Sequence, residues 1–535
     1  MTTLSLAVLL AESAKRTPGR VAVVEGELRL TYAELWADVL QRAGELAAAG
    51  VEPGTRVALL APNVVDFVRS YYAILTAGGV VVPVPTLLSG DEAAHIVATS
   101  GAQLLVCDAE CAPLGEAVVA ATGIQRLDAA GETGPDRAAP LRTYAHRRAD
   151  DPAVVFYTSG TTGRPKGAVL NHLNLVMNAT VNAFDANAIA GDDVVVGCLP
   201  LFHTFGQTVA MNATFRVGAA LVLQPRFDPE AAIDLMVREK ATAFFGVPTM
   251  YTRLLEAAER RTELPRLEMC VSGGASLPVA VLERFEKVFE TTVYEGYGLS
   301  ETSPTATVNQ PVFGTRAGSV GHPVWGVEVE VADADVEGRI VLLDEDRTGE
   351  IVVRGHNVFD GYLDDPEATA AVLVDGWFRT GDIGTKDAAG FISIVDRKKD
   401  LIIRGGFNVY PREVEEALAR HPEVAQVAVV GLPDEDLGEE VCAVVVPQPD
   451  ADVDPRALTE WARERLGGHK YPRQVRVVPQ LPLGPSHKVL KRELRRQLTQ
   501  EPPAPGRPES ADTDTSTARE LHERPSHGGT IHGNR

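Results

Sequence analysis

Short apolar runs alternate with helical stretches along most of the chain up to residue 331. The runs at 57–60, 80–82 and 104–107 have the length of buried strands, and helical stretches separate them. This alternation is typical of parallel sheets whose strands are connected by helices. It returns in a second set of apolar runs, at 194–196, 220–223, 243–245 and 269–271. We therefore predict an α/β fold of layered subdomains.

Local signals at the ends of the predicted elements agree with this assignment. Residues 20–31 indicate a short hairpin. Thr31 and Glu34 then form a capping-box pattern, which starts the next helix. A further helix is predicted over 279–289, with apolar residues on one face and Ser276 as its cap.

The pattern changes twice towards the carboxyl end. Short strands with Asp and Gly turns at 329–354 predict a small β-rich subdomain. A charged run at 396–400 then precedes a compact pattern of about a hundred residues, an ordinary size for a domain. The final segment is rich in Pro, Ser, Thr, Asp, Gly and His, a composition that predicts disorder. We thus expect a large amino-terminal domain (1–395), a hinge linker (396–400), a small mobile α+β carboxyl-terminal domain (401–500) and a disordered tail (501–535).

Composition and charge limit the function classes. The 535 residues exceed what one hydrophobic core usually holds, which agrees with several domains. A formal net charge of −22 argues against a nucleic-acid binder, so an anionic ligand needs a local basic patch. The five cysteines are scattered, and we expect isolated thiols rather than disulfides or a metal site. Because no apolar run has the length of a membrane span, we expect a cytoplasmic chain without an integral membrane segment.

The candidate chemistry begins in a loop rich in glycine and hydroxyl groups. It occupies 157–167 (YTSGTTGRPKG), directly after the apolar run 153–156, which predicts a buried strand. Glycines let backbone amides approach an anion, hydroxyls add donors and Lys166 adds a positive charge, so the loop suits a polyphosphate. Pro165 stands where a Walker-type loop has its second glycine, which excludes that loop. The candidate phosphate-binding residues are Thr158, Ser159, Gly160, Thr161, Thr162, Gly163 and Lys166.

Other segments could complete a nucleotide site. The strand at 269–271 runs into small residues that would let a purine lie against the backbone. Residues 294–302 bring together an aromatic ring for adenine, a hydroxyl for phosphate and the carboxylate of Glu301 for Mg²⁺. Asp382 could accept hydrogen bonds from ribose hydroxyls, and Arg397 could donate to the ribose or to a phosphate. The remaining candidate nucleotide-binding residues are Gly273, Gly274, Ala275, Glu295, Gly296, Tyr297, Gly298 and Ser300.

The order of these motifs resembles the adenylate-forming superfamily, and within it the fatty acyl-CoA synthetases. The resemblance includes segments 349–355, 360–362 and 377–382, and it runs from about residue 31 to about residue 498. It implies an AMP-forming acid–thiol ligase that uses ATP, Mg²⁺ and coenzyme A. In such enzymes a carboxylate attacks the α-phosphate of ATP and pyrophosphate leaves. A pantetheine thiol then displaces AMP from the acyl-adenylate.

The resemblance also implies a catalytic cation in the smaller domain. Lys488 occupies the position of the family's catalytic lysine, which would neutralise charge developing at the α-phosphate. His487 before it departs from the glycine usual in relatives, and a residue other than glycine narrows the backbone freedom of this loop. We expect Lys491 and Arg492 on the surface of a terminal helix.

A hinge is implied as well. By position it is Lys399, about which the carboxyl-terminal domain would rotate between the two reaction steps. After that rotation Gly405, Gly406 and Phe407 would line the pantetheine tunnel.

The substrate class rests on the same resemblance. Residues 199–206 open the acyl pocket in relatives, with the candidate catalytic residue His203 near its wall, and no aspartate stands where amino-acid-activating domains bind the α-amine. Segments 295–301 and 407–411 look most like fatty acyl-CoA ligases. A medium- or long-chain fatty acid is therefore predicted, with an aromatic acid as the second choice. Two alternatives stay open: loading of a holo acyl carrier protein, and an adenylate-binding module without turnover.

Overall fold

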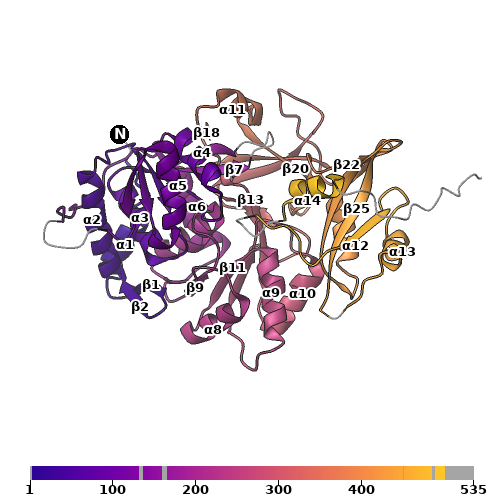
Figure 1. Cartoon of the computed structure of the whole chain (residues 1–535), viewed down its shortest axis with the longest axis horizontal. Helices are drawn as coiled ribbons and strands as arrows, with labels where there is room; N and C mark the ends of the chain where they lie inside the picture. Colours follow the sequence, from indigo (N-terminus) through magenta and orange to yellow (C-terminus); the bar gives the residue numbers. More distant parts are fainter. Residues whose placement is uncertain (1–2, 132–136, 160–164, 450, 485–488, 501–535) are drawn as a thin grey trace, which may run out of the picture.

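Four sheets and their connecting helices build the molecule (Figure 1). The structure, a computed structural model, describes residues 3–131, 137–159, 165–449, 451–484 and 489–500. In Figure 1 the carboxyl-terminal elements, drawn in orange and yellow, gather at the end of the molecule opposite the amino-terminal elements. The predicted α/β fold class, with a large domain of layered subdomains and a small α+β domain, is confirmed.

The first sheet has seven strands in the order β18-β8-β7-β4-β3-β5-β6. The pairs among β3 to β7 are parallel, whereas β8 pairs antiparallel with β7 and with β18. Side chains alternate between its faces, so that Val57 and Leu59 join one core cluster while Ala58 and Leu60 join another. Its strands are β3 (Arg56–Leu60), β4 (Val80–Pro83), β5 (Leu104–Cys107), β6 (Gln125–Asp128), β7 (Pro152–Ser159), β8 (Pro165–Asn171) and β18 (Gly361–Tyr362).

The second sheet has nine strands in the order β15-β14-β13-β12-β11-β9-β10-β1-β2. Each predicted apolar run between 194 and 271 is one of its parallel strands, and the predicted amino-terminal hairpin is β1–β2. Its strands are β1 (Val21–Glu25), β2 (Leu28–Thr31), β9 (Val194–Gly197), β10 (Ala220–Leu223), β11 (Ala243–Gly246), β12 (Met269–Ser272), β13 (Val293–Gly298), β14 (Thr305–Val308) and β15 (His322–Pro323).

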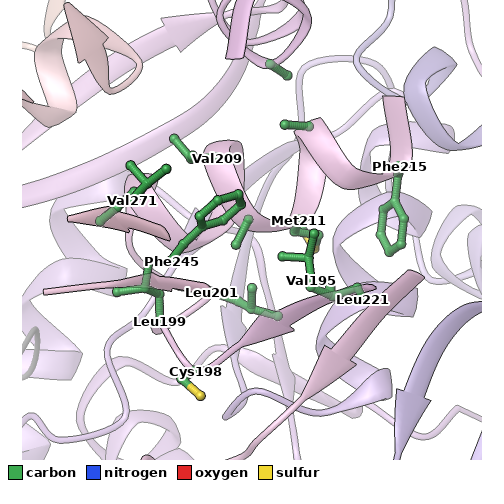
Figure 2. Packing of buried hydrophobic residues seen from close by; sticks show 14 of the residues in the cluster. Val195, Cys198, Leu199, Leu201, Val209, Met211, Phe215, Leu221, Phe245 and Val271 are labelled. Carbon is green, nitrogen blue, oxygen red and sulfur yellow. The ribbon is translucent and has the colours of Figure 1, made fainter. Parts of the chain in front are cut away.

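A layer of helices lies between these two sheets. Helix α3 contacts β3 and β4 of one sheet and β1 of the other, and all of its residues except Asp66 and Arg69 are buried. On the nine-stranded sheet, side chains of β9 to β12 meet those of η3 in one apolar cluster (Figure 2). The helical segments of the large domain are α1 (Val8–Arg16), α2 (Tyr32–Ala48), α3 (Val65–Thr76), α4 (Gly90–Ser100), η1 (Ala109–Cys111), α5 (Ala112–Thr122), α6 (His172–Val181), η2 (Asn182–Ala186), η3 (Phe205–Asn212), α7 (Ala213–Val217), α8 (Pro229–Glu239), α9 (Pro248–Ala258), α10 (Val279–Phe289), η4 (Ser300–Thr302) and α11 (Pro366–Val372).

One of the two predicted helix caps is confirmed. The Thr31 side chain accepts from the Glu34 amide and Glu34 reaches back to the Thr31 amide, as the capping box requires. The predicted cap of α10 is wrong. The helix begins at Val279 with Pro278 as its N-cap residue, so Ser276 lies two residues too early for its hydroxyl to cap the first turn.

The predicted β-rich subdomain is a five-stranded sheet, and a second five-stranded sheet organises the small domain. Asp396 and Arg397 are the last residues of β21, so the large domain continues two residues into the segment predicted as the linker. The β-rich sheet contains β16 (Val327–Ala332), β17 (Gly349–Gly355), β19 (Leu373–Val374), β20 (Trp377–Lys386) and β21 (Ile392–Arg397). The small domain contains β22 (Ile402–Arg404), β23 (Phe407–Val409), α12 (Pro411–Leu418), β24 (Val424–Asp434), β25 (Gly438–Pro447), α13 (Pro455–Arg465), β26 (Gln474–Val477) and α14 (Lys491–Gln500).

The helices and the cysteines of the described residues add two observations. Within the described ranges, each helix is too short or too polar to serve as a bilayer span. All five cysteines are buried and carry free thiols, and the described residues form no cluster that could hold a metal ion through three His, Cys, Asp or Glu side chains.

Candidate active site

A cleft of about 2640 Å³ lies where the sheets of the large domain face the small domain. Ligand pockets for one small molecule commonly measure about 300–1,000 Å³, so this cleft has room for more than one ligand. Its lining includes residues from most of the segments that we predicted as functional from the sequence. They are Thr158, Lys166, His203, Gly273, Gly274, Ala275, Glu295, Gly296, Tyr297, Gly298, Ser300, Glu301, Asp382, Arg397 and Lys399.

The predicted metal ligand Glu301 is held in place by two hydroxyl groups. It lies in η4 and is 7% exposed. Its Oε1 accepts from Thr158 Oγ1 at 3.3 Å and from Tyr362 Oη at 3.0 Å. Thr158 comes from β7 and Tyr362 from β18, which lie on either side of β8 in the sheet. A carboxylate oxygen beside two hydroxyls is a donor set that fits Mg²⁺, a cation that prefers hard oxygen ligands.

The phosphate-loop lysine also approaches this group. Lys166 Nζ lies 3.4 Å from Asp365 Oδ2 and 5.4 Å from the centre of the Tyr362 ring. Ser159 ends β7. Gly160, Thr161, Thr162 and Gly163 lie outside the described residues.

The predicted ribose ligand Asp382 lies on β20, directly across from Arg397 on β21. Arg397 Nε is 3.3 Å from Asp382 Oδ1, and Tyr297 Oη donates to Asp382 Oδ2 at 2.7 Å. Burial and the neighbouring Asp382 carboxylate raise the pKa of Tyr297, so its hydroxyl remains a donor at neutral pH. Tyrosine, aspartate and arginine from three strands therefore meet at one side of the cleft.

The candidate adenine segment leaves little room for side chains. A Cβ added to Gly273 would lie 3.2 Å from Phe205 Cε1, and Gly274 has a φ of +81°, which favours glycine. Beside it Glu295 is 1% exposed and accepts from the Leu277 amide at 3.1 Å. Burial raises the pKa of Glu295 to about 7.

The turn that carries Glu301 depends on a glycine. A Cβ on Gly298 would come within 1.8 Å of the Pro304 carbonyl oxygen, so this position has no room for a side chain. Thr204 Oγ1 donates to Ser300 Oγ at 3.0 Å, which ties the turn to the segment of His203. His203 lines the cleft, and its Nδ1 accepts from the Phe205 amide at 3.2 Å.

Two predicted functional regions of the small domain differ in whether their described residues line the cleft. Gly405 and Gly406 form the turn between β22 and β23, and Phe407 is 58% exposed and contacts the His469 ring at a tilt of 32°. Among the described residues, none between 401 and 411 lines the cleft.

The described neighbours of the predicted catalytic lysine have the opposite placement. Gly484, Val489 and Leu490, which flank it, do line the cleft. Lys488 and His487 themselves lie outside the described residues.

One expectation about this region is wrong. Lys491 begins the terminal helix α14, but its side chain is only 24% exposed and lines the cleft. Its Nζ lies 2.6 Å from Glu415 Oε1. Burial acts to lower the pKa of Lys491, but the carboxylates of Glu415 and Asp396 outweigh it and raise that pKa. The helix pattern gave no sign of this contact, because Glu415 belongs to α12, far away in the sequence. Arg492 is exposed, as expected.

Two functional candidates were missed as individual residues. Tyr362 stood in a recognised motif, yet its contact with Glu301 depends on β18 pairing with β8. Asp365 caps α11 by accepting from the Ala368 amide, and such a cap is ordinarily only structural.

Comparisons with known proteins agree with this geometry. The family model described as AMP-binding enzyme matches residues 10–363, and that described as AMP-binding enzyme C-terminal domain matches residues 413–488. The chain belongs to the AMP-binding enzyme family. The resemblance to adenylate-forming enzymes of the acyl-CoA ligase type is therefore confirmed.

Individual relatives extend over nearly the whole chain. A feruloyl-CoA synthase from Amycolatopsis sp is 39% identical over 491 residues, 91% of this chain and 97% of that protein. A long-chain-fatty-acid–CoA ligase from Bacillus subtilis (strain 168) is 34% identical, covering 93% of this chain and 95% of that protein. Among solved structures, ATP-bound MatB from Rhodopseudomonas palustris has a TM-score of 0.83 at 33% identity, covering 93% of this chain and 99% of that chain.

Proposed function

We propose that this chain is an ATP-dependent acid–thiol ligase that activates a medium- or long-chain fatty acid and transfers it to coenzyme A. The observation that carries the proposal is that one cleft is lined by two groups: Glu301 with Thr158 and Tyr362, beside Lys166, and Asp382 with Tyr297 and Arg397. One group suits phosphates and the other suits a ribose. Relatives named for ATP-bound or CoA-linked chemistry cover almost the full chain, which supports both substrates.

In the first step an oxygen of the fatty acid carboxylate bonds to the α-phosphorus of ATP, and the bond from that phosphorus to the bridging oxygen of pyrophosphate breaks. Lys166 would bind the phosphates, and Lys488 would offset the charge that develops at the α-phosphate. Asp382 would fix the ribose. Glu301 would hold Mg²⁺, which when bound supplies charge screening for the phosphates.

In the second step the thiolate of coenzyme A attacks the acyl carbonyl and AMP leaves with the electron pair of the broken bond. For this step we propose a rotation about Lys399, because the turn of Gly405 and Gly406 lies away from the cleft in this structure while Gly484, Val489 and Leu490 line it. This arrangement suits the first step. Rotation of the small domain would bring the turn of Gly405 and Gly406 to the cleft for the second step.

The acyl substrate is inferred from the cleft between η3 and the ends of β12 and β14. Its lining there includes the apolar residues Phe205, Val209, Val271 and Val308, with Asn182 and Thr305 as polar residues. Val209 and Val271 lie in the same apolar cluster although they come from different elements (Figure 2). This lining favours an alkyl chain. An aromatic acid is the second candidate, because the feruloyl-CoA synthase has 39% identity.

A chain-length series tests the substrate class. Saturated fatty acids of increasing length would be offered with ATP, Mg²⁺ and coenzyme A, beside ferulic and benzoic acids, and pyrophosphate release measured. We expect kcat/KM to rise about fourfold per methylene, since each buried CH₂ contributes about 0.8 kcal/mol, until the chain fills the cleft. The variant Val209→Thr keeps the branched side-chain shape and replaces one methyl group with a hydroxyl. It should reduce kcat/KM for fatty acids by about tenfold and leave the KM for ATP unchanged. Faster turnover of the aromatic acids would support the second candidate. No pyrophosphate release with any of the acids would contradict the proposed ligase activity.

A further inference from the structure

A buried group of charges joins the two domains beside the cleft. Asp396, at the end of β21 in the large domain, is 7% exposed and accepts from the backbone amide of Arg412 at 2.9 Å. Its other oxygen accepts from the Arg397 amide at 2.7 Å. Arg412 belongs to α12 of the small domain. The carboxylate is therefore shared between a strand of one domain and the first turn of a helix of the other.

The side chain of Arg412 makes a second connection across the same boundary. One terminal nitrogen donates to the Ile394 carbonyl oxygen of β21, and Nε donates to Glu416 Oε1 at 3.0 Å. The Arg412 side chain is 11% exposed, so these bonds are largely shielded from water. Its positive charge also lies near enough to the buried Glu295 to favour the ionised form of that carboxyl. Arg412 thus contacts the large domain through both its backbone and its guanidinium group.

The same cluster continues to the loop before α14. Glu415, one turn along α12 from Arg412, forms the 2.6 Å ion pair with Lys491 and accepts from the Val429 amide at 2.8 Å. Lys491 begins the helix directly after Val489 and Leu490, which line the cleft. The position of α12 against β21 therefore fixes the start of α14 relative to the large domain.

We propose that Arg412 is a positioning residue for adenylate formation: it holds the small domain in the orientation in which Gly484, Val489 and Leu490 line the cleft. The inference rests on the proposed two-step function. Ile394 and Asp396 precede the linker and Arg412 follows it, so rotation about Lys399 must break both connections. Arg412 therefore favours the first half-reaction and contributes nothing to the second.

Measuring the half-reactions separately tests this assignment. Adenylate formation is followed by exchange of labelled pyrophosphate into ATP, and thioester formation by supplying the purified acyl-adenylate with coenzyme A. A hydrogen bond to a charged group contributes enough to change an equilibrium roughly 10- to 100-fold. We expect Arg412→Ala to slow exchange by about that factor and to leave thioester formation within about twofold of wild type. Arg412→Lys keeps the charge but not the paired geometry, and should recover only part of the loss.

The chain offers a matched control on the same helix. Glu413 pairs with Lys470 at 2.8 Å, and both residues belong to the small domain. Lys470→Ala therefore removes an ion pair of α12 without touching the large domain. It should leave both half-reactions unchanged.

Hydrogen exchange provides a measurement that needs no substrate. The Arg412 amide is retained in Arg412→Ala, and peptides covering 392–397 and 409–414 should exchange faster than in wild type, whereas Lys470→Ala should not change them. Equal loss of both half-reactions, or unchanged exchange in both peptides, would overturn the proposal. Because exchange is read without substrate, this failure is distinct from an inactive wild-type enzyme, which would instead contradict the proposed function.

Discussion

At the scale of single residues, the role that we predict for the Glu301 carboxylate depends on the side chains that contact it. The sequence placed Glu301 beside a hydroxyl and an aromatic ring in one short segment, which was enough to predict a nucleotide or metal role. It did not predict that Thr158 and Tyr362 would hold the same oxygen, because those contacts arise from strand order in the seven-stranded sheet. Local chemistry was readable in the sequence. The convergence of distant strands was not.

Replacing Glu301 separates these contributions. Glu301→Gln keeps the size and hydrogen-bonding capacity of the side chain but removes its negative charge, so Mg²⁺ binding should weaken. We expect pyrophosphate exchange to fall by about 100-fold or more, a size typical of removing one electrostatic group from an active site. The loss should shrink as the Mg²⁺ concentration in the exchange assay is raised.

Tyr362→Phe is the matched control for that prediction. It removes only the 3.0 Å hydrogen bond to Glu301 and leaves the carboxylate in place. A loss of about tenfold or less is expected. If Glu301→Gln and Tyr362→Phe had equal effects, independent of Mg²⁺, the role of the carboxylate charge would be wrong.

At the scale of elements, a buried histidine in α6 forms a hydrogen bond with the backbone just before α1. His172, the first residue of α6, is fully buried, and its Nδ1 accepts from the Leu6 amide at 3.0 Å. Burial, with a contribution from the nearby Arg147 cation, lowers the pKa of His172 from 6.5 to about 4. This contact joins residues far apart in the sequence, and no periodic pattern could have predicted it.

The depressed pKa predicts acid sensitivity. The unfolded chain takes up a proton at this histidine near pH 6.5 and the folded chain only near pH 4, so stability falls as the pH is lowered through that window. Protonation of this histidine lowers the free energy of unfolding by about 3 kcal/mol in total, because one pKa unit corresponds to about 1.4 kcal/mol. Denaturant unfolding at several pH values would measure it.

His172→Gln is the comparison for the pH series. Glutamine can accept from the Leu6 amide but does not titrate, so the variant should lose less stability than wild type between pH 6.5 and 4. Identical pH profiles for the two proteins would contradict the assignment.

At the scale of the whole molecule, the layered α/β architecture could be predicted from the sequence because the apolar runs are short and regularly interrupted. The runs at 57–60 and 243–245 are strands of the two large sheets. How the domains meet could not be predicted. Lys491 looked like a surface residue of an amphipathic helix, and only the position of α12 beside β21 gives its ammonium a buried neighbour.

The linker is where this arrangement can be tested. The amides on either side of Lys399 donate to Gly381 and Arg397 carbonyls at 2.9 and 3.0 Å, and proline at 399 leaves both of these donors in place. Lys399→Pro restricts the backbone rotation that we propose for the second step. It should retain adenylate formation within about twofold and lose most thioester formation, by about tenfold or more, while Lys399→Ala should keep both. Equal loss of the two half-reactions would reject this residue as the hinge.

The most direct test of the account is a single-turnover experiment on the wild-type chain. Enzyme, ATP, Mg²⁺ and a long-chain fatty acid are mixed without a thiol, and coenzyme A or a holo acyl carrier protein is then added in parallel reactions. We predict that acyl-adenylate and pyrophosphate form first, and that coenzyme A then converts the adenylate into acyl-CoA and AMP while the carrier protein remains unloaded. Absence of the adenylate, or an adenylate that coenzyme A does not consume, would contradict the account.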